Sequence, residues 1–428
     1  MALVVPLGMF AAGCGDDGFN ETPAADAAEP ETDAGSPETD AAEPEPDAGQ
    51  AVTGALARVG AGNHHSVIMV EDVVYAMGEN ASGQLGNGVF DPSPSSSLNP
   101  TPGPVMGLDG LTVRSVYAGL NHNAALTEDG QLYVWGANNT GQLGDGAEEN
   151  RNQAAMIALE NVASVAFGTS HSLAVTTAGE LYAWGNNSFG KLGLGDTEER
   201  LVPTRVEALA EETIVAAVAS VLHSVAITDD GRVFTWGRDS RGQIGDGDDS
   251  NDDEVLTPFE VPGVSGVVSI GAGNFNTFAV TGDGELYGWG EGRYGQLMDV
   301  DPPTNSDGDE YTPRLLDLRD VAAVAGGSRY VVALTTFGEV YSWGDNGPIG
   351  ALGRGIQTDD VFSTPAPIAS PPGVRFSEVV CATNHCLALA EDGTVFSWGT
   401  ASYGRLGVDL DFCTGLTKGG PDQPLGYC

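Results

Sequence analysis

The sequence predicts an all-β protein: a seven-bladed β-propeller of four-stranded blades, preceded by a disordered acidic tether. Three observations predict this fold. A Trp-Gly pair, Met-Gly at its first occurrence, recurs seven times at intervals of 49 to 58 residues. Each copy holds four short runs of alternating apolar residues, separated by turns rich in Gly and Asp. A lone four-stranded sheet with two apolar faces is unstable in water, and a ring of seven sheets covers every face.

The first 14 residues have the pattern of an export signal. They read MALVVPLGMFAAGC, an apolar run too short to span a membrane, with small residues before Cys14. The segment resembles a bacterial lipoprotein signal, in which Cys14 would be acylated. Ala11 stands where Leu is usual, and no Lys or Arg precedes the apolar run. We expect an exported, lipid-anchored protein of the cell envelope; the alternative is a secreted, soluble protein.

Residues 15–52 form the predicted tether. They contain twelve acidic residues and no basic one, in a segment of Ala, Pro, Thr, Asp and Glu. Such a segment has little apolar surface to bury, so it is expected to stay extended by charge repulsion and proline stiffness. Residues 53–428 are then the propeller.

The repeated Trp residues are the expected wedges between blades. Each has a large apolar area and one N–H to satisfy, and burying it contributes about 2 to 3 kcal/mol. The seven positions are Met77, Trp135, Trp184, Trp236, Trp289, Trp343 and Trp398. The last copy ends just as its fourth strand begins, so ring closure is expected to depend on this terminus pairing near the first copy.

The repeat resembles that of the regulator of chromosome condensation family. The segment HNAALTEDGQLYVWGANNTGQLGDG carries the resemblance, which extends over all seven copies, about residues 56–428. The resemblance implies a rigid disc that binds proteins through its loops. Members of the family include a guanine-nucleotide exchange factor for a small GTPase and a secreted bacterial inhibitor of β-lactamases. An exported protein would not meet a nuclear GTPase, which disfavours the exchange function.

Four of the five cysteines lie in the last copy, as expected in an oxidising compartment. Among three possible pairings, we favour nearest neighbours, Cys381 with Cys386 and Cys413 with Cys428. A metal site of these thiols with His385 is the alternative, but the spacing matches no zinc pattern.

Five histidines occupy one repeat position, just after the first strand: His65, His122, His171, His223 and His385. Asn276 and Tyr330 replace the histidine in the other two copies. A metal ring is disfavoured, because rotational symmetry holds equivalent residues apart. We expect a structural role, in which a ring nitrogen bonds the backbone of the adjacent turn.

Two acidic insertions raise the question of calcium, at residues 246–254 and 305–310. They supply oxygen ligands, but neither follows the order of an EF-hand loop. A solvated run of charge is the favoured interpretation, and no metal or cofactor is predicted.

The Gly-rich turn after each Trp-Gly is the candidate binding surface. Aromatic and basic residues gather in these turns, and equivalent turns lie on one face of a propeller. Exposed aromatics with Arg are common anchors of protein interfaces. The candidates are Phe189, Lys191, Arg238, Arg241, Arg293, Tyr294, Tyr403 and Arg405. Ordinary variation of solvated loops is the alternative.

Charge and motifs narrow the function. The formal net charge of −43 disfavours nucleic acid and direct adhesion to anionic lipid, leaving the lipid on Cys14 as the membrane contact. The sequence contains no G-x-S-x-G, H-E-x-x-H or phosphate-loop motif. We therefore expect a monomeric, non-catalytic protein that binds a protein partner or a surface polymer. The alternative is a carbohydrate-active hydrolase or lyase on the same scaffold.

Overall fold

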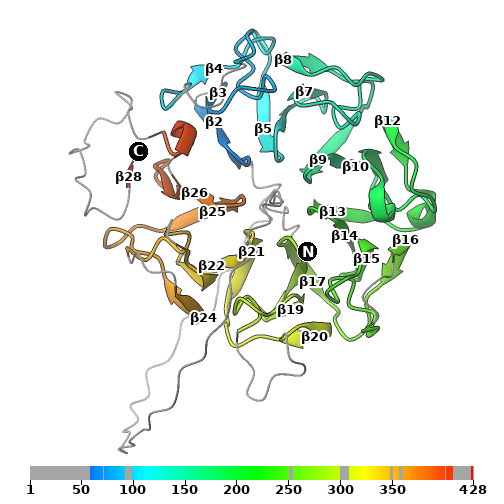
Figure 1. Ribbon diagram of the computed structural model, residues 1–428, viewed down its shortest axis with the longest axis vertical. Coiled ribbons are helices and arrows are strands. Elements are labelled where there is room, and N and C mark those ends of the chain that lie inside the picture. Colours follow the sequence, from blue (N-terminus) through cyan, green and yellow to red (C-terminus); the bar gives the residue numbers. More distant parts are fainter. Residues whose placement is uncertain are drawn as a thin grey trace, which may run out of the picture.

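A computed structural model describes residues 58–70, 72–91, 99–249, 254–298, 308–347, 350–355, 360–400, 402–407 and 426–427. The predicted signal and tether lie outside these residues. The described chain forms seven four-stranded antiparallel sheets arranged as a ring (Figure 1), which confirms the predicted propeller.

Each sheet is one blade, and its strands pair in chain order. The first strand of each blade lies nearest the centre of the ring and the fourth lies at the rim (Figure 1). Blade 1 comprises β1 (Val59–Ala61), β2 (His65–Val70), β3 (Val73–Gly78) and β4 (Gly103–Pro104), and blade 2 comprises β5 (Val113–Ala118), β6 (His122–Thr127), β7 (Leu132–Gly136) and β8 (Arg151–Met156). Blade 3 comprises β9 (Val162–Phe167), β10 (His171–Thr176), β11 (Leu181–Gly185) and β12 (Arg200–Arg205). Blade 4 comprises β13 (Ile214–Ala219), β14 (His223–Thr228), β15 (Val233–Arg238) and β16 (Glu254–Glu260).

Blades 5 to 7 repeat the same order. Blade 5 comprises β17 (Val267–Ala272), β18 (Asn276–Thr281), β19 (Leu286–Gly290) and β20 (Glu310–Leu315). Blade 6 comprises β21 (Val321–Gly326), β22 (Tyr330–Thr335), β23 (Val340–Asp345) and β24 (Val361–Pro367). Blade 7 comprises β25 (Phe376–Cys381), β26 (His385–Ala390), β27 (Val395–Gly399) and β28 (Gly426–Tyr427). The described residues also form three short 3₁₀ helices, η1 (Ser188–Gly190), η2 (Glu207–Leu209) and η3 (Ser402–Gly404). Among the described residues, no helix is long and apolar enough to cross a membrane.

The ring closes by packing of blade 7 against blade 1. Strand β1 contacts both β25 and β26, and Val59 and Ala61 share an apolar cluster with Val380 and Leu387. The expectation that the C-terminus pairs near the first copy is wrong. Strand β28 instead pairs with β27 and completes blade 7. All seven blades follow this order, with the fourth strand beside the third strand of the same copy.

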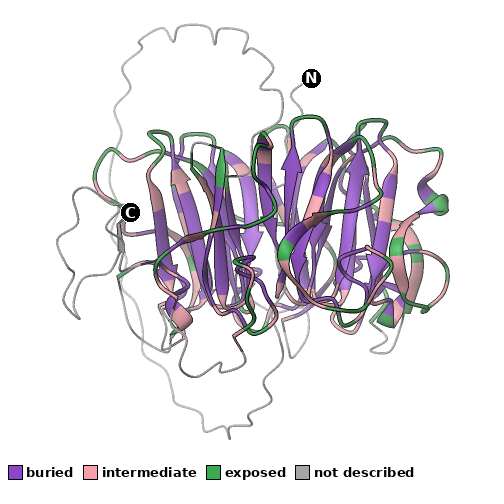
Figure 2. Cartoon of the chain, turned by 90° about the horizontal axis from the view of Figure 1, so that it is seen from above, coloured by how far each residue is buried: buried purple, intermediate pink, exposed green. Residues whose placement is uncertain are grey.

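The antiparallel order gives the disc two faces. The turns between first and second strands and the Gly-rich loops between third and fourth strands end on one face, here called the glycine-loop face. The turns between second and third strands end on the other face. Buried strands run between exposed loops at the two faces (Figure 2). The sequence-predicted binding residues therefore all belong to one face.

Candidate binding surface

The Trp residues fix each glycine-rich loop against the next blade. All six are buried, and each indole Nε1 donates to a main-chain carbonyl in the loop of the preceding blade. Trp184 Nε1, for example, lies 2.9 Å from Gln142 O. Gly144, at a φ of +75°, packs against the Trp184 ring, and a Cβ there would lie 2.6 Å from Nε1. The loops are thus held rigidly at the seams between blades.

The five histidines also act between blades, but not as expected. The predicted bond to the backbone of the adjacent turn is wrong: each Nε2 contacts a side chain on the second strand of the next blade. His171 Nε2 lies 2.9 Å from Ser224 Oγ, and Ser224 Oγ donates to Lys191 O. Because that hydroxyl proton is already used, Nε2 carries the hydrogen and donates. The partner is a side chain because the ring extends across the seam toward the next blade.

These histidines are neutral in the folded protein. Burial lowers the pKa of His65 to about 4 and that of His122 and His223 to about 3. Burial also holds the pKa of His171 and His385 well below the usual value. Their role is to link blades, and they are inaccessible to a ligand.

Two of the predicted binding residues, Lys191 and Arg405, lie inside the disc. They are only 4% and 2% exposed. Lys191 Nζ donates to Ser170 Oγ at 3.1 Å, and Arg405 donates to Asn63 O at 2.7 Å. Burial lowers the pKa of Lys191 to about 8 and that of Arg405 to about 10. They occupy the loop position that holds a buried Gln in four other copies, so their interpretation as surface anchors is wrong.

The three aromatic candidates remain at the surface, half-buried in the seams. Each stacks on a cationic or imidazole side chain of the following blade. Phe189 lies 4.7 Å from the Arg238 guanidinium, and Tyr294 lies 4.4 Å from that of Arg329. Tyr403 stacks on His64, with ring centroids 4.7 Å apart. The stacking holds the rings in fixed orientations, with part of each surface open to solvent.

The remaining basic candidates are paired with neighbouring carboxylates. Arg241 contacts Asp309 at 3.3 Å, and exposed Arg293 contacts Glu291 at 3.0 Å. Burial raises the pKa of both carboxyl groups, although the arginines oppose that shift. Together with the aromatic pairs, these contacts form the seam surface, defined as Phe189, Arg238, Arg241, Arg293, Tyr294, Arg329, Tyr403 and His64.

Sequence reasoning did not find Arg329 and His64. Both lie in turns between first and second strands, outside the Gly-rich loops. Their signal is their position in the repeat: each directly precedes the histidine position, at Tyr330 and His65. The antiparallel order brings these turns beside the glycine-rich loop of the preceding blade.

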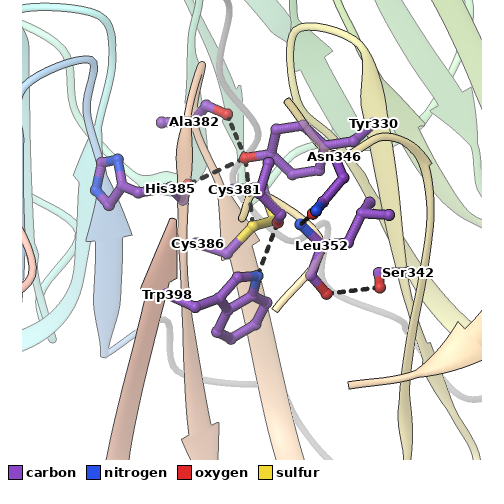
Figure 3. The surroundings of a disulfide bond; sticks show 10 residues. Tyr330, Ser342, Asn346, Leu352, Cys381, Ala382, His385, Cys386 and Trp398 are labelled. Atoms are coloured by element: carbon purple, nitrogen blue, oxygen red, sulfur yellow. Dashed lines mark hydrogen bonds between the residues drawn. A yellow bond between two sulfur atoms is a disulfide. The ribbon is translucent and has the colours of Figure 1, made fainter. Parts of the chain in front are cut away.

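The last blade contains the predicted disulfide. Cys381 and Cys386 lie directly opposite each other on β25 and β26, and their sulfurs are bonded, which confirms this pairing. Tyr330 of blade 6 donates to Ala382 O at 2.9 Å, so the bond lies at the seam between blades 6 and 7 (Figure 3). The predicted pair of Cys413 and Cys428, like Cys14, lies outside the described residues.

Comparisons with known proteins agree with this geometry. Seven blades of four antiparallel strands in chain order, with loops fixed by Trp, define a β-propeller built from sequence repeats. Its faces carry turns that vary from copy to copy. The chain belongs to the regulator of chromosome condensation (RCC1) repeat family: the RCC1-like domain matches residues 155–415, and the RCC1 repeat matches residues 71–126 and 129–175.

A curated relative and two solved structures illustrate the family. The ultraviolet-B receptor UVR8 of Arabidopsis thaliana is 34% identical over 360 residues, which cover 82% of this chain and 78% of UVR8. The structure of human WBSCR16 is 25% identical with a TM-score of 0.67, covering 78% of this chain and 86% of that one. Prp20p of Saccharomyces cerevisiae, described with its binding to Gsp1p and histones, is 23% identical with a TM-score of 0.65, covering 80% and 84%.

Proposed function

We propose that this protein is a non-catalytic binding protein of the cell envelope, which presents its glycine-loop face to a protein partner or a surface polymer. The observation that carries the proposal is the seam surface. Partly exposed aromatic rings are held in place by an arginine or histidine side chain of the next blade at three separate seams. Rigid aromatic and Arg side chains bind partners with a low entropy cost, because few rotamers are lost.

Family membership supports a binding or regulatory role. UVR8 is named a receptor and Prp20p is described by its binding to proteins. The scaffold is suited to such a role, since seven interlocked blades hold the loops with little rearrangement on binding. The partners of these relatives are not carried over to this chain.

The binding role is tested by capture from envelope extract with the fragment of residues 50–428. Wild-type fragment is compared with the triple variant Phe189→Ala, Tyr294→Ala and Tyr403→Ala. We expect the wild type to enrich a specific partner that the triple variant does not retain, while circular dichroism and thermal unfolding stay close to wild type. Retention of the same partner by the folded triple variant would remove the seam surface from the proposal.

The envelope location is a separate part of the proposal. It rests on the small residues that precede Cys14 and on the acidic segment 15–52. In cells fed a labelled fatty acid, the full chain should take up label and partition with membranes, and Cys14→Ser should abolish both. Unlabelled wild-type protein would disprove lipid anchoring without bearing on the binding role.

A further inference from the structure

The glycine-rich loop of blade 4 departs from the way the loops of copies one to three are closed. In copies one to three, the Asn three residues after the Trp or Met position uses both ends of its side-chain amide. Asn138 Oδ1 accepts from Leu143 N at 2.9 Å, and its Nδ2 donates to Asp145 Oδ1 and to Ala147 O, each at 3.0 Å. Asn80 and Asn187 make the same kind of contacts. The amide NH₂ group therefore lies between oxygen acceptors.

Blade 4 has Asp239 at this position. The carboxylate is seated like the amides, because Oδ1 accepts from Ile244 N at 2.9 Å. Asp239 is only 1% exposed, and its Oδ2 has no hydrogen-bond partner. This second oxygen takes the place of the NH₂ group. A donor has been replaced by an acceptor in a buried position, which is costly unless something positive lies there.

The residues that supply acceptor oxygens to the Asn side chain in blade 2 have equivalents in blade 4. The residues seven and nine places after Asp239 are Asp246 and Asp248, at the places of Asp145 and Ala147 in blade 2. Asp246 Oδ1 accepts from Asp248 N at 2.9 Å, as Asp145 Oδ1 accepts from Ala147 N at 3.1 Å. The loops share this contact, so we expect the Asp246 carboxylate and the main-chain carbonyl of Asp248 to face Asp239 as Asp145 and Ala147 face Asn138 in blade 2.

In blades 2 and 3 an arginine pairs with the aspartate of the loop, and blade 4 has no arginine at the equivalent position. Arg151 pairs with Asp145, and Arg200 pairs with Asp196. These arginines lie opposite Gly136 and Gly185 in the strand register. The residue opposite Gly237 in blade 4 is Val255. Blade 4 therefore gathers more negative charge than blades 2 and 3 while lacking the arginine that balances it there.

We propose that this loop binds a Ca²⁺ ion through Asp239, Asp246 and the main-chain carbonyl of Asp248. Ca²⁺ prefers carboxylate and carbonyl oxygens and tolerates irregular geometry, with waters completing six to eight ligands. Among the described residues, no three His, Cys, Asp or Glu side chains are grouped to hold a metal, so the carbonyl is a required ligand. The site is separate from the seam surface and does not depend on the proposed function.

The test uses the full chain freed of metal with a chelator. Titration calorimetry and thermal unfolding are measured with CaCl₂, and with MgCl₂ at equal ionic strength. We expect one Ca²⁺ per chain at a saturable site and a rise in Tm with Ca²⁺ that exceeds the rise with Mg²⁺. Asp239→Asn should abolish both effects and, without Ca²⁺, should be at least as stable as metal-free wild type, because the amide restores the contacts of blade 2.

Glu148→Gln is the matched control, since it removes one exposed acidic charge from the equivalent loop of blade 2. It should keep the Ca²⁺ response of the wild type. A wild type without a saturable Ca²⁺ response, as expected if a proton shared between Asp239 and Asp246 neutralises the loop, would overturn the proposal. So would a response that survives in Asp239→Asn.

Discussion

The residue at the position of Gln142 determines the backbone conformation of each glycine-rich loop. In four copies a Gln side chain accepts from the amide two residues earlier; Gln142 Oε1, for example, accepts from Thr140 N at 2.9 Å. Lys191 and Arg405 have no acceptor to offer at this position. In those two loops the residue two places earlier, Phe189 or Tyr403, adopts a φ of +64°. This left-handed conformation is unfavourable for an aromatic residue.

Lys191→Gln should therefore stabilise the protein. The new amide oxygen would accept from Phe189 N, relieve the left-handed backbone and remove a buried amine. We expect the free energy of unfolding in urea to rise by about 1 kcal/mol. The reverse change, Gln142→Lys, should lower it by a similar amount. Destabilisation by Lys191→Gln would show that the contact of Lys191 with Ser170 matters more than the loop geometry.

The burial of Lys191 and Arg405 could have been predicted from the sequence. The stretches TGQL, FGKL and YGRL align Lys191 and Arg405 with Gln142, and that alignment predicts a shared, buried position. Reading them instead as surface bases came from their charge, since Lys and Arg are seldom buried. The left-handed φ of the aromatics was not predictable, because it depends on which acceptor the loop provides.

At five seams the histidine position bonds a side chain on the second strand of the next blade, and the seam between blades 5 and 6 lacks this bond. Thr277 of blade 5 accepts from His223 and donates to Gln243 O at 2.8 Å. The equivalent residue of blade 6 is Val331, which is buried and has no hydroxyl, and Asn276 Oδ1 at the histidine position of blade 5 has no hydrogen-bond partner. Blades 5 and 6 thus lack the bond that the histidine position makes at five other seams, although Asn274 Nδ2 donates to Ser328 Oγ at 3.3 Å between their turns.

Val331→Thr should supply the missing bond. Thr has nearly the shape of Val, and its hydroxyl would donate to Gln296 O as Thr277 donates to Gln243 O. We expect chemical denaturation to show a gain of about 1 kcal/mol. Val332→Thr is the control, because the next residue points to the opposite, apolar face of the strand; there the unpaired hydroxyl should cost about 1 to 3 kcal/mol. Equal losses in both variants would contradict this account of the seam.

The sequence predicted the strands well and their lateral contacts poorly. Alternating runs such as QLYVWG, bounded by Gly and Asp, are local signals, and β7 forms where such a run predicts it. The partner of His171 lies 53 residues away, on Ser224 of the next copy. A repeat shows that a position matters in every copy, but the register between neighbouring copies depends on how the sheets pack.

The whole molecule is strongly acidic, and three of its arginines lie beside aromatic rings at seams. Its formal charge is −43, yet Arg238, Arg293 and Arg329 each lie against an aromatic ring on the glycine-loop face. The number of blades and the ring were predictable from the seven copies. The strands that close the ring were not, because the packing of β1 against β25 and β26 depends on how the first and last blades meet.

The central claim is that a partner binds the glycine-loop face through the seam surface. Its most direct test is the dissociation constant of the captured partner for three proteins: the wild type, the triple variant at Phe189, Tyr294 and Tyr403, and Phe337→Ala. Phe337 is 59% exposed in the turn between β22 and β23, on the opposite face. We predict at least about a tenfold loss of affinity in the triple variant, as expected for interface aromatics, and none in Phe337→Ala. Equal affinity of all three proteins, or a loss confined to Phe337→Ala, would contradict the account.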